Sequence, residues 1–334
     1  MATTAREYHL AARPQGIPKP DDFRLVTREL PDPGAGQVLV RNEVLSVDPY
    51  MRGRMNDVKS YVPPFQLDRP LEGAAVGTVL ASGDPAVPVG ASVLHMAGWR
   101  DHALLSAGEA RVVDTAQAPA GAYLGVLGTT GLTAWVGLLE IAALKPGESV
   151  FVSGAAGAVG SIAGQIAKLK GAGRVVGSAG GPHKARALVE RFGYDAAIDY
   201  RLGDVRGQLS QAAPDGIDVY FDNVGGEHLE AAISAARRYA RFALCGSIAQ
   251  YNNTEAEPGP RNLALAIGKR LTLRGFIVLD NLKDFGRFAA DMVPWLAEGR
   301  IDAAETVAEG LESTPQAFIA LFSGGNTGKM LVRL

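Results

Sequence analysis

Residues 151–170 read FVSGAAGAVGSIAGQIAKLK, and the hydrophobic period changes within this stretch. The first residues are apolar and favour a β-strand, whereas apolar residues recur at helical spacing from Val159 to Leu169. The glycines at the junction lie three residues apart: Gly154, Gly157 and Gly160. The pattern therefore predicts a strand, a glycine turn and an amphipathic helix.

Such a junction is suited to binding a phosphate. A helix N-terminus offers N–H groups without intrahelical partners and a partial positive charge. Glycines let the backbone turn tightly and let a phosphate approach it closely. We therefore predict a dinucleotide site here, although the spacing is GxxGxxG and a tight turn without a ligand remains the alternative.

The composition indicates a globular protein without a nucleic-acid surface. The chain has 334 residues, 47% of them hydrophobic and 20% charged, and its net charge is −2. This length allows two domains, and the charge gives no electrostatic reason to expect nucleic acid as a partner. No apolar run reaches the length of a membrane span, and residues 1–16 contain no hydrophobic signal core. We expect no membrane association and a cytoplasmic location.

Cysteine and histidine give no pattern typical of a metal site. Cys245 is the single cysteine, which excludes an intrachain disulfide and a multi-cysteine zinc site. It lies in the apolar, strand-like run 241–248, so we interpret it from the residues alone as a buried, unreactive thiol. The five histidines lack the spacing of a zinc motif. We predict no bound metal.

The chain changes character near residue 121. Residues 1–120 contain short strand-like runs broken by Gly, Pro and Asp, including 43–51. From residue 149 onward strands and helices alternate, which predicts an α/β fold with a doubly wound parallel sheet. The six expected strands are 149–154, 174–180, 195–200, 216–226, 240–248 and 271–278. Further helices and strands follow residue 282, and we expect the C-terminus to return to the first domain.

The end of the second expected strand favours NADP over NAD. NAD-binding folds usually carry an acidic residue there to bind the ribose 2′-hydroxyl. This chain has Gly180 and Gly181 instead, followed by Lys184 and Arg186. A cation there suits the 2′-phosphate of NADP(H), although both charges could simply be solvated. Tyr200 ends the third expected strand at the same edge and could cover the adenine or bind this phosphate.

Several stretches together resemble the zinc-free medium-chain dehydrogenase/reductases. They are VDPYMRGRM (47–55), LGTTGLTAW (127–135), 153–171, YFDNVGGE (220–227), CGSIAQYN (245–252) and GGNTGKMLV (324–332). Within that family they are similar to the leukotriene B4 12-hydroxydehydrogenase, prostaglandin reductase and alkenal double-bond reductase branch, which includes bacterial curcumin-reductase-like enzymes. The resemblance implies a GroES-like β-rich catalytic domain (1–122 and 300–334) and a Rossmann NADP-binding domain (123–299).

The resemblance also implies an activity and a set of cofactor residues. The activity is transfer of hydride from NADPH to the β-carbon of an α,β-unsaturated ketone or aldehyde. The implied cofactor residues are Ala156, Gly157, Ala158, Val159, Lys184, Tyr200, Asn223, Cys245, Gly246, Ser247, Ile248, Tyr251, Phe276, Ile277, Val278 and Asn326.

Two tyrosines are candidate catalytic residues. Hydride addition to an enone places negative charge on the carbonyl oxygen, so the site needs a hydrogen-bond donor there. Tyr251 lies in a polar loop just past the fifth expected strand, where parallel sheets bind ligands, and the resemblance implies that it helps to stabilise the enolate. Tyr50 follows the turn at Asp48–Pro49 and resembles a substrate-facing tyrosine of the plant reductases. A surface position for Tyr251 and a packing role for Tyr50 are the alternatives.

Other functions stay open at this point. A quinone reductase of the same fold would share the cofactor residues, and allylic or secondary alcohol oxidation uses the same cofactor. A non-catalytic NADPH-binding protein is the third alternative, because fold does not fix function. The apolar run 271–278 would be the last strand of the sheet, and an uncovered edge strand invites pairing, so we expect a homodimer.

Overall fold

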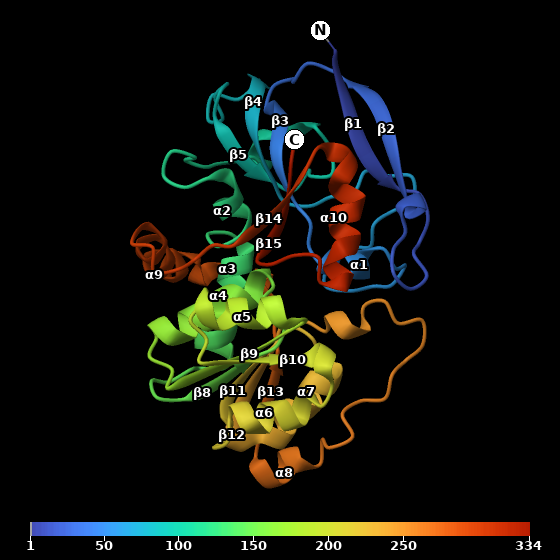
Figure 1. Ribbon diagram of the computed structural model, residues 1–334. Helices are drawn as coiled ribbons and strands as arrows, with labels where there is room; N and C mark the ends of the chain where they lie inside the picture. Colours follow the sequence, from blue (N-terminus) through green and yellow to red (C-terminus); the bar gives the residue numbers. More distant parts are fainter. Residues whose placement is uncertain (1) are drawn as a thin grey trace. The chain divides into compact units, whose positions relative to one another are not determined.

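The structure is a computed structural model that describes residues 2–334 and divides into two compact units. The first unit comprises Met1–Leu124, Glu305–Asn326 and Met330–Leu334. The second comprises Gly125–Ala304 and Thr327–Lys329. The chain thus passes from one unit to the other and back (Figure 1). The domain boundaries expected from the sequence stay a prediction.

The second unit is built on a six-stranded sheet in which every pair is parallel. The strand order is β10-β9-β8-β11-β12-β13, the order of a doubly wound dinucleotide-binding sheet. The strands are β8 (Ser149–Val152), β9 (Arg174–Ala179), β10 (Ala196–Asp199), β11 (Ile217–Asp222), β12 (Ala236–Leu244) and β13 (Thr272–Gly275). Strand β8 is buried along its whole length, as expected for a strand covered on both faces.

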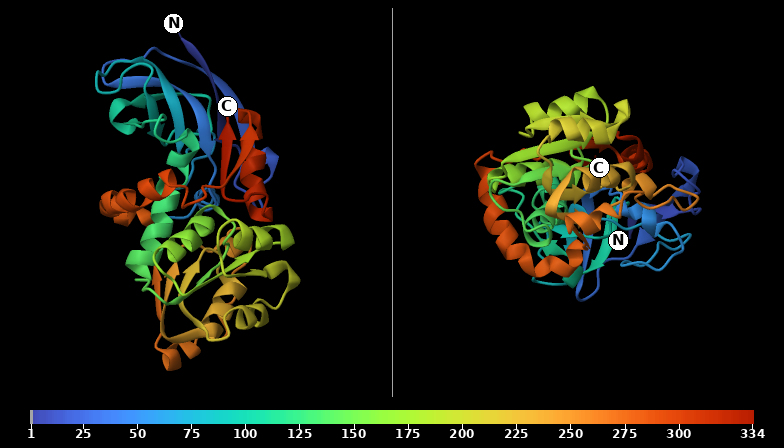
Figure 2. Two further views of the ribbon diagram at one scale, coloured as in Figure 1. Left: turned by 60° about the vertical axis from the view of Figure 1, so that its left-hand side comes forward. Right: turned by 90° about the horizontal axis from the view of Figure 1, so that it is seen from below.

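Helices cover both faces of this sheet (Figures 1 and 2). Strands β8, β9 and β10 are added toward one edge of the sheet, and β11, β12 and β13 toward the other. Because parallel crossovers are right-handed, this change puts α4 and α5 on one face and α6 and α7 on the other. Val205 and Leu209 of α6 and Ala232 of α7 belong to a core cluster with Phe151 and Tyr220. The helices are α3 (Thr129–Val136), α4 (Ala158–Leu169), α5 (Pro182–Glu190), α6 (Val205–Ala212), α7 (Gly226–Ala235), α8 (Leu265–Lys269) and α9 (Phe285–Ala297).

The first unit is mainly antiparallel β-structure. Its seven-stranded sheet runs β14-β15-β3-β4-β5-β7, with β6 also paired to β3, and β1 and β2 form a separate ribbon. The strands are β1 (Thr3–Leu10), β2 (Phe23–Leu30), β3 (Gln37–Ser46), β4 (Ala75–Ser82), β5 (Ser92–His95), β6 (His102–Ser106), β7 (Arg111–Val112), β14 (Glu305–Glu309) and β15 (Lys329–Arg333). The helices are α1 (Tyr50–Arg54), α2 (Ala120–Leu124) and α10 (Thr314–Ala320).

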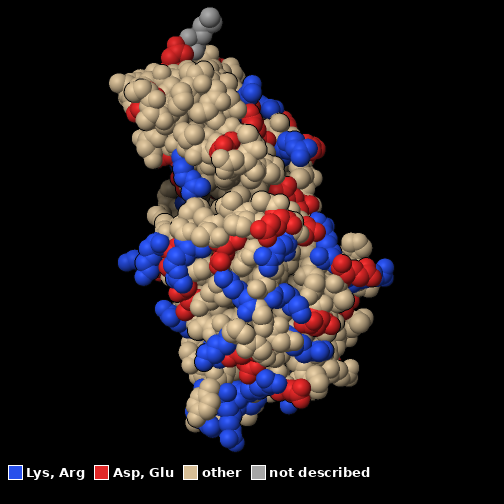
Figure 3. All heavy atoms as spheres, turned by 90° about the vertical axis from the view of Figure 1, so that its left-hand side faces the viewer, with Lys and Arg blue, Asp and Glu red and all other residues tan. Residues whose placement is uncertain are grey.

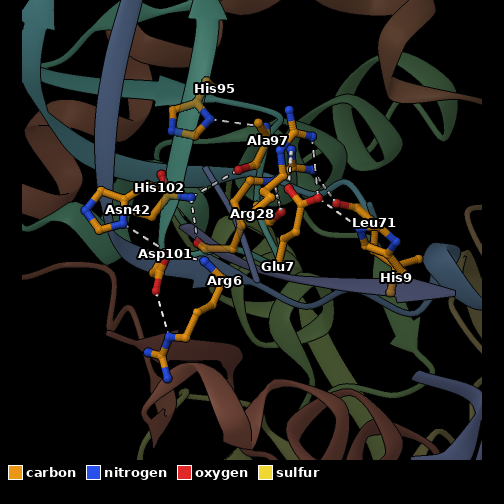
Figure 4. A network of polar contacts seen from close by, with 12 residues as sticks. Arg6, Glu7, His9, Arg28, Asn42, Leu71, His95, Ala97, Asp101 and His102 are labelled. Carbon is orange, nitrogen blue, oxygen red and sulfur yellow. Dashed lines mark hydrogen bonds and ion pairs between the residues drawn. The ribbon is translucent and has the colours of Figure 1, made fainter. Parts of the chain in front are cut away.

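A buried charge is neutralised inside the first unit (Figure 4). Glu7 is 2% exposed, and its Oε1 lies 2.8 Å from His9 Nε2 and 3.6 Å from a guanidinium nitrogen of Arg28. A guanidinium nitrogen of Arg100 lies 3.8 Å from the other oxygen. Burying a carboxylate is unfavourable unless cations and hydrogen bonds compensate it, so these contacts are needed for β1 to pack here.

The elements differ from the sequence expectations at several boundaries. Residues 43–51 are not one strand: β3 ends at Ser46 and α1 begins at Tyr50, because Pro49 favours the start of a helix. Strand β12 ends at Leu244, so Cys245 follows the strand rather than lying in it. Strand β13 likewise ends at Gly275, before Phe276.

Three further elements lack a clear signal in the sequence: the ribbon of β1 and β2, helix α6 and the short helix α8. The ribbon of β1 and β2 was not assigned, because its strands alternate too irregularly between buried and exposed residues. Helix α6 was not assigned either, because Val205 and Leu209 are its only buried residues.

Candidate functional site

The glycine turn between β8 and α4 has the geometry of an anion site. Gly154 has a φ of +58°, and α4 begins after Gly157 with no side chain capping it. The first-turn N–H groups of Ala158 and Val159 therefore lack an intrahelical or side-chain acceptor. A Cβ on Gly160 would lie 2.4 Å from the Gly154 carbonyl oxygen, so only glycine lets the helix start this close to the turn.

A segment from near the C-terminus completes this turn. The Gly328 N–H donates to the Ala156 carbonyl at 2.8 Å, and Gly157 and Gly328 form an isolated β-bridge. Gly328 has a φ of +71°, and a Cβ there would lie 2.0 Å from the Ala304 carbonyl oxygen. Gly328 is thus a residue of the glycine turn that the sequence reading missed. Its signal, the glycine two residues after Asn326, was visible in GGNTGK.

The residues expected at the 2′-phosphate converge at the end of β9. A Cβ on Gly180 would lie 2.5 Å from the Tyr200 hydroxyl, so the turn rests against this side chain. Lys184 stands in the first turn of α5, and burial, with the charge of Arg201 as the second cause, lowers its pKa. The Tyr200 ring also packs edge-on against buried His228, with 5.5 Å between ring centroids. Arg186 is exposed.

A buried aspartate at the end of β11 orders the centre of the site. Asp222 is 2% exposed, and its Oδ1 accepts hydrogen bonds from the Ser153 and Tyr220 hydroxyls at 2.9 and 2.7 Å. The same oxygen accepts from the N–H groups of Val224 and Gly225. Asp222 therefore fixes the DNVGG turn, a role that the sequence reading did not assign.

Asn223 joins this turn to the glycine turn. Its Nδ2 donates to the Ser153 carbonyl at 2.7 Å, and its N–H donates to the Ser153 hydroxyl at 2.9 Å. Its carbonyl oxygen accepts from the N–H of Ile248, at 3.2 Å. The ends of β8, β11 and β12 are thus held together by one residue.

The loop after β12 carries Tyr251 at the same edge of the sheet. The Tyr251 hydroxyl accepts from the Ser247 N–H at 3.3 Å, which leaves its own proton for donation to another group. Burial raises the pKa of Tyr251, so the phenol stays protonated at neutral pH. The N–H groups of Cys245 and Gly246 donate to the Asp222 carbonyl. Cys245 is partly exposed rather than buried as expected, but the desolvation of its thiol raises the pKa to about 12, so the thiol stays protonated at neutral pH.

The remaining predicted residues lie in three places. Phe276 packs edge-on against Phe221 after β13, and Ile277 and Val278 follow it at the start of a 3₁₀-helix. Asn326 is the last residue of a first-unit segment and directly precedes Thr327–Lys329. Tyr50 belongs to the first unit.

Tyr50 packs beside the core of its unit. It lies against the cluster that contains Met51 and Met55, both with no exposed surface. Burial raises its pKa, and the Asp48 carboxylate is a weaker cause in the same direction. This environment fits the packing alternative and leaves the substrate-facing role as a proposal.

Residues 2–334 offer neither a metal-binding cluster nor a membrane-spanning helix. No group of three or more His, Cys, Asp and Glu side chains among them could hold a metal ion. No helix in this range is long and apolar enough to cross a membrane. On the face shown in Figure 3, basic and acidic side chains are interspersed.

Comparisons with known proteins place the chain in a family. Residues 6–113 match the family described as "N-terminal domain of oxidoreductase", and residues 158–298 match "Zinc-binding dehydrogenase". The NADPH-dependent curcumin reductase of Escherichia coli is 42% identical over 98% of this chain and 96% of its own. The chain is a medium-chain dehydrogenase/reductase. The resemblance and the fold class expected from the sequence are thereby confirmed.

Two more members of this family are similar along nearly the whole chain. The NADP(+)-dependent 2-alkenal reductase of Nicotiana tabacum is 41% identical over 95% of this chain and 94% of its own. The structure of CurA from Vibrio vulnificus in complex with NADPH superposes with a TM-score of 0.94, at 42% identity and 98% coverage of both chains.

Proposed function

We propose that this medium-chain dehydrogenase/reductase reduces the C=C bond of α,β-unsaturated ketones and aldehydes with NADPH. The observation that carries the proposal is the carboxyl edge of the parallel sheet. The glycine turn, Lys184, Tyr200 and a protonated Tyr251 all follow strands at this edge. The similarity to a curcumin reductase and to a 2-alkenal reductase supports it further.

The donor groups fit NADP(H). The uncapped N-terminus of α4 offers N–H groups from Ala158 and Val159 to the pyrophosphate. Lys184 and Tyr200 supply a cation and a hydroxyl beside the Gly180 turn, where a 2′-phosphate would lie. Asn223, Gly246, Ser247 and Ile248 follow β11 and β12 and would hold the nicotinamide end. Phe276, Ile277 and Val278, which follow β13, would give it an apolar wall. Bound NADPH supplies the hydride.

The protein's contribution to the reaction is orientation and charge stabilisation. Hydride addition at the β-carbon moves an electron pair onto the carbonyl oxygen. The Tyr251 hydroxyl keeps its proton and can donate it as a hydrogen bond to that oxygen, directly or through the nicotinamide ribose. Water then donates a proton to the α-carbon, which restores the carbonyl group and completes the reduction. We also propose that Tyr50 faces the substrate. The protein is further proposed to act as a homodimer.

Oxidation of NADPH measured at 340 nm tests this function. The panel is trans-2-nonenal, 4-phenyl-3-buten-2-one, 1,4-naphthoquinone and a saturated aldehyde, each repeated with NADH. We expect turnover of the enal and the enone with NADPH and none of the saturated aldehyde. Turnover of the quinone alone would make the protein a quinone reductase. Tight NADPH binding with no turnover would favour a non-catalytic role.

A further inference from the structure

Arg201 reaches the turn after β9, which Tyr200 also contacts and which leads into the first turn of α5, where Lys184 lies. A Cβ on Gly180 would lie 3.1 Å from Arg201 Nε, and a Cβ on Gly181 would lie 3.7 Å from a terminal guanidinium nitrogen. The guanidinium therefore lies along both glycines of the turn. A larger residue at Gly180 would occupy the space that this side chain uses.

Arg201 and Lys184 are also electrostatic neighbours. The positive charge of Arg201 is one of the two causes that lower the pKa of Lys184, the larger being burial. Like charges repel each other, so an anion that contacts both side chains would be bound favourably here. The N-terminus of α5, with neither an acidic residue in its first turn nor a side-chain cap, adds partial positive charge.

Asp199 holds the two parts of this corner together. Its Oδ1 accepts from the Gly181 N–H at 2.8 Å and from the Arg201 N–H at 3.0 Å. The Asp199 N–H in turn donates to the Gln208 side chain at 3.0 Å. Asp199 is 8% exposed, so one buried carboxylate fixes the turn after β9 and the start of the segment that carries Arg201.

We propose that Arg201 determines the specificity for NADPH. Together with Lys184 it binds the 2′-phosphate, and Asp199 positions it. A phosphate monoester carries a charge of about −1.5 to −2 near neutral pH, more than one lysine neutralises. The planar guanidinium offers paired donors that match phosphate geometry. This inference rests on NADPH being the cofactor of the proposed function.

Calorimetric binding tests it without any substrate. The ligands are NADPH and NADH, together with 2′,5′-ADP and 5′-AMP, which differ only in the 2′-phosphate. We expect Arg201→Ala to weaken NADPH and 2′,5′-ADP binding about 10- to 100-fold, the range for a lost hydrogen bond to a charged group. NADH and 5′-AMP binding should stay within about twofold of wild type.

The matched control is Arg238→Ala, which removes the same charge from an exposed position on β12. It should change NADPH binding by less than about twofold. Arg201→Lys keeps the charge but loses the paired donors of the guanidinium. Its affinity for NADPH should therefore fall between those of the wild type and Arg201→Ala. Asp199→Asn keeps an acceptor at Oδ1 and should retain more NADPH affinity than Asp199→Ala.

Two results would overturn the role of Arg201. One is an Arg201→Ala variant that binds 2′,5′-ADP as tightly as Arg238→Ala does. The other is equal weakening of NADPH and NADH, which would mean that Arg201 supports the turn rather than the phosphate. A wild-type protein that does not prefer 2′,5′-ADP over 5′-AMP would instead refute the cofactor assignment itself.

Discussion

At the residue scale, the Tyr251 hydroxyl decides how the developing charge is stabilised. It accepts one hydrogen bond from the Ser247 N–H and keeps its own proton. We expect Tyr251→Phe to lower kcat on 4-phenyl-3-buten-2-one about a hundredfold, because one oxyanion donor is lost. The Kd for NADPH, measured by fluorescence titration, should change little. Tyr239→Phe is the control, since Tyr239 is 64% exposed on β12. An unchanged kcat would remove Tyr251 from the mechanism.

His95 makes the stability of the first unit dependent on pH. It is 3% exposed, its Nδ1 accepts from the Ala97 N–H, and its Nε2 has no hydrogen-bond partner. Burial lowers its pKa to about 4, below the usual 6.5. As pH falls from about 6.5 to about 4, the unfolded chain takes up a proton that the folded chain does not, so stability is lost across that window.

A variant isolates this contribution. In His95→Asn, the side-chain oxygen can accept the Ala97 N–H in place of the histidine Nδ1. The asparagine side chain takes up no proton between pH 8 and pH 4. Denaturant unfolding at pH 8 and pH 4 should show the wild type losing about 3 kcal/mol more than the variant, at 1.36 kcal/mol per unit of pKa. Equal losses in both proteins would show that His95 does not titrate in this way.

At the element scale, the glycine turn depends on a segment more than 150 residues away in the sequence. We expect Gly328→Ala to destabilise the protein by about 2 kcal/mol or more, because alanine strains a φ of +71° and its Cβ would meet the Ala304 carbonyl. NADPH binding should weaken as well, since the Gly328 N–H bonds the Ala156 carbonyl.

Thermal unfolding and NADPH titration measure these two effects. Gly299→Ala is the control: Gly299 also has a positive φ, of +66°, but no atom lies within 4 Å of the place that an alanine Cβ would take. This variant should show the backbone strain with unchanged NADPH affinity. Equal NADPH affinities in Gly328→Ala and the wild type would show that the contact between Gly328 and Ala156 does not affect cofactor binding.

The elements also explain what the sequence could predict. The strand–turn–helix at 151–170 was predictable because its period changes from strand to helix within a few residues. Lys184 and Tyr200 could be proposed from the sequence because Lys184 closely follows the second predicted strand and Tyr200 ends the third. Asp199 and Gly328 were missed because their roles are contacts between segments distant in the sequence, and no local pattern records such pairings. Helix α6 was missed because two apolar residues give too weak a period.

At the scale of the whole molecule, β13 bears on the proposed homodimer. It is the last strand of the six-stranded sheet, and Thr272, Arg274 and Gly275 on it are exposed. A strand edge of this kind presents unpaired N–H and C=O groups to a second chain. Size-exclusion chromatography with light scattering should therefore give twice the mass of one chain at micromolar concentration.

A lysine on this edge tests whether β13 makes the contact. Lysine is a residue that natural proteins use to block edge pairing, so Thr272→Lys should raise the dimer dissociation constant at least about tenfold. Leu202→Lys places the same residue after β10, at the opposite end of the strand order, where Leu202 is 80% exposed. It should leave the mass unchanged. If the wild type has the mass of one chain, the dimer is refuted. If the Thr272→Lys and Leu202→Lys dimers have the same dissociation constant, the two subunits do not meet at β13.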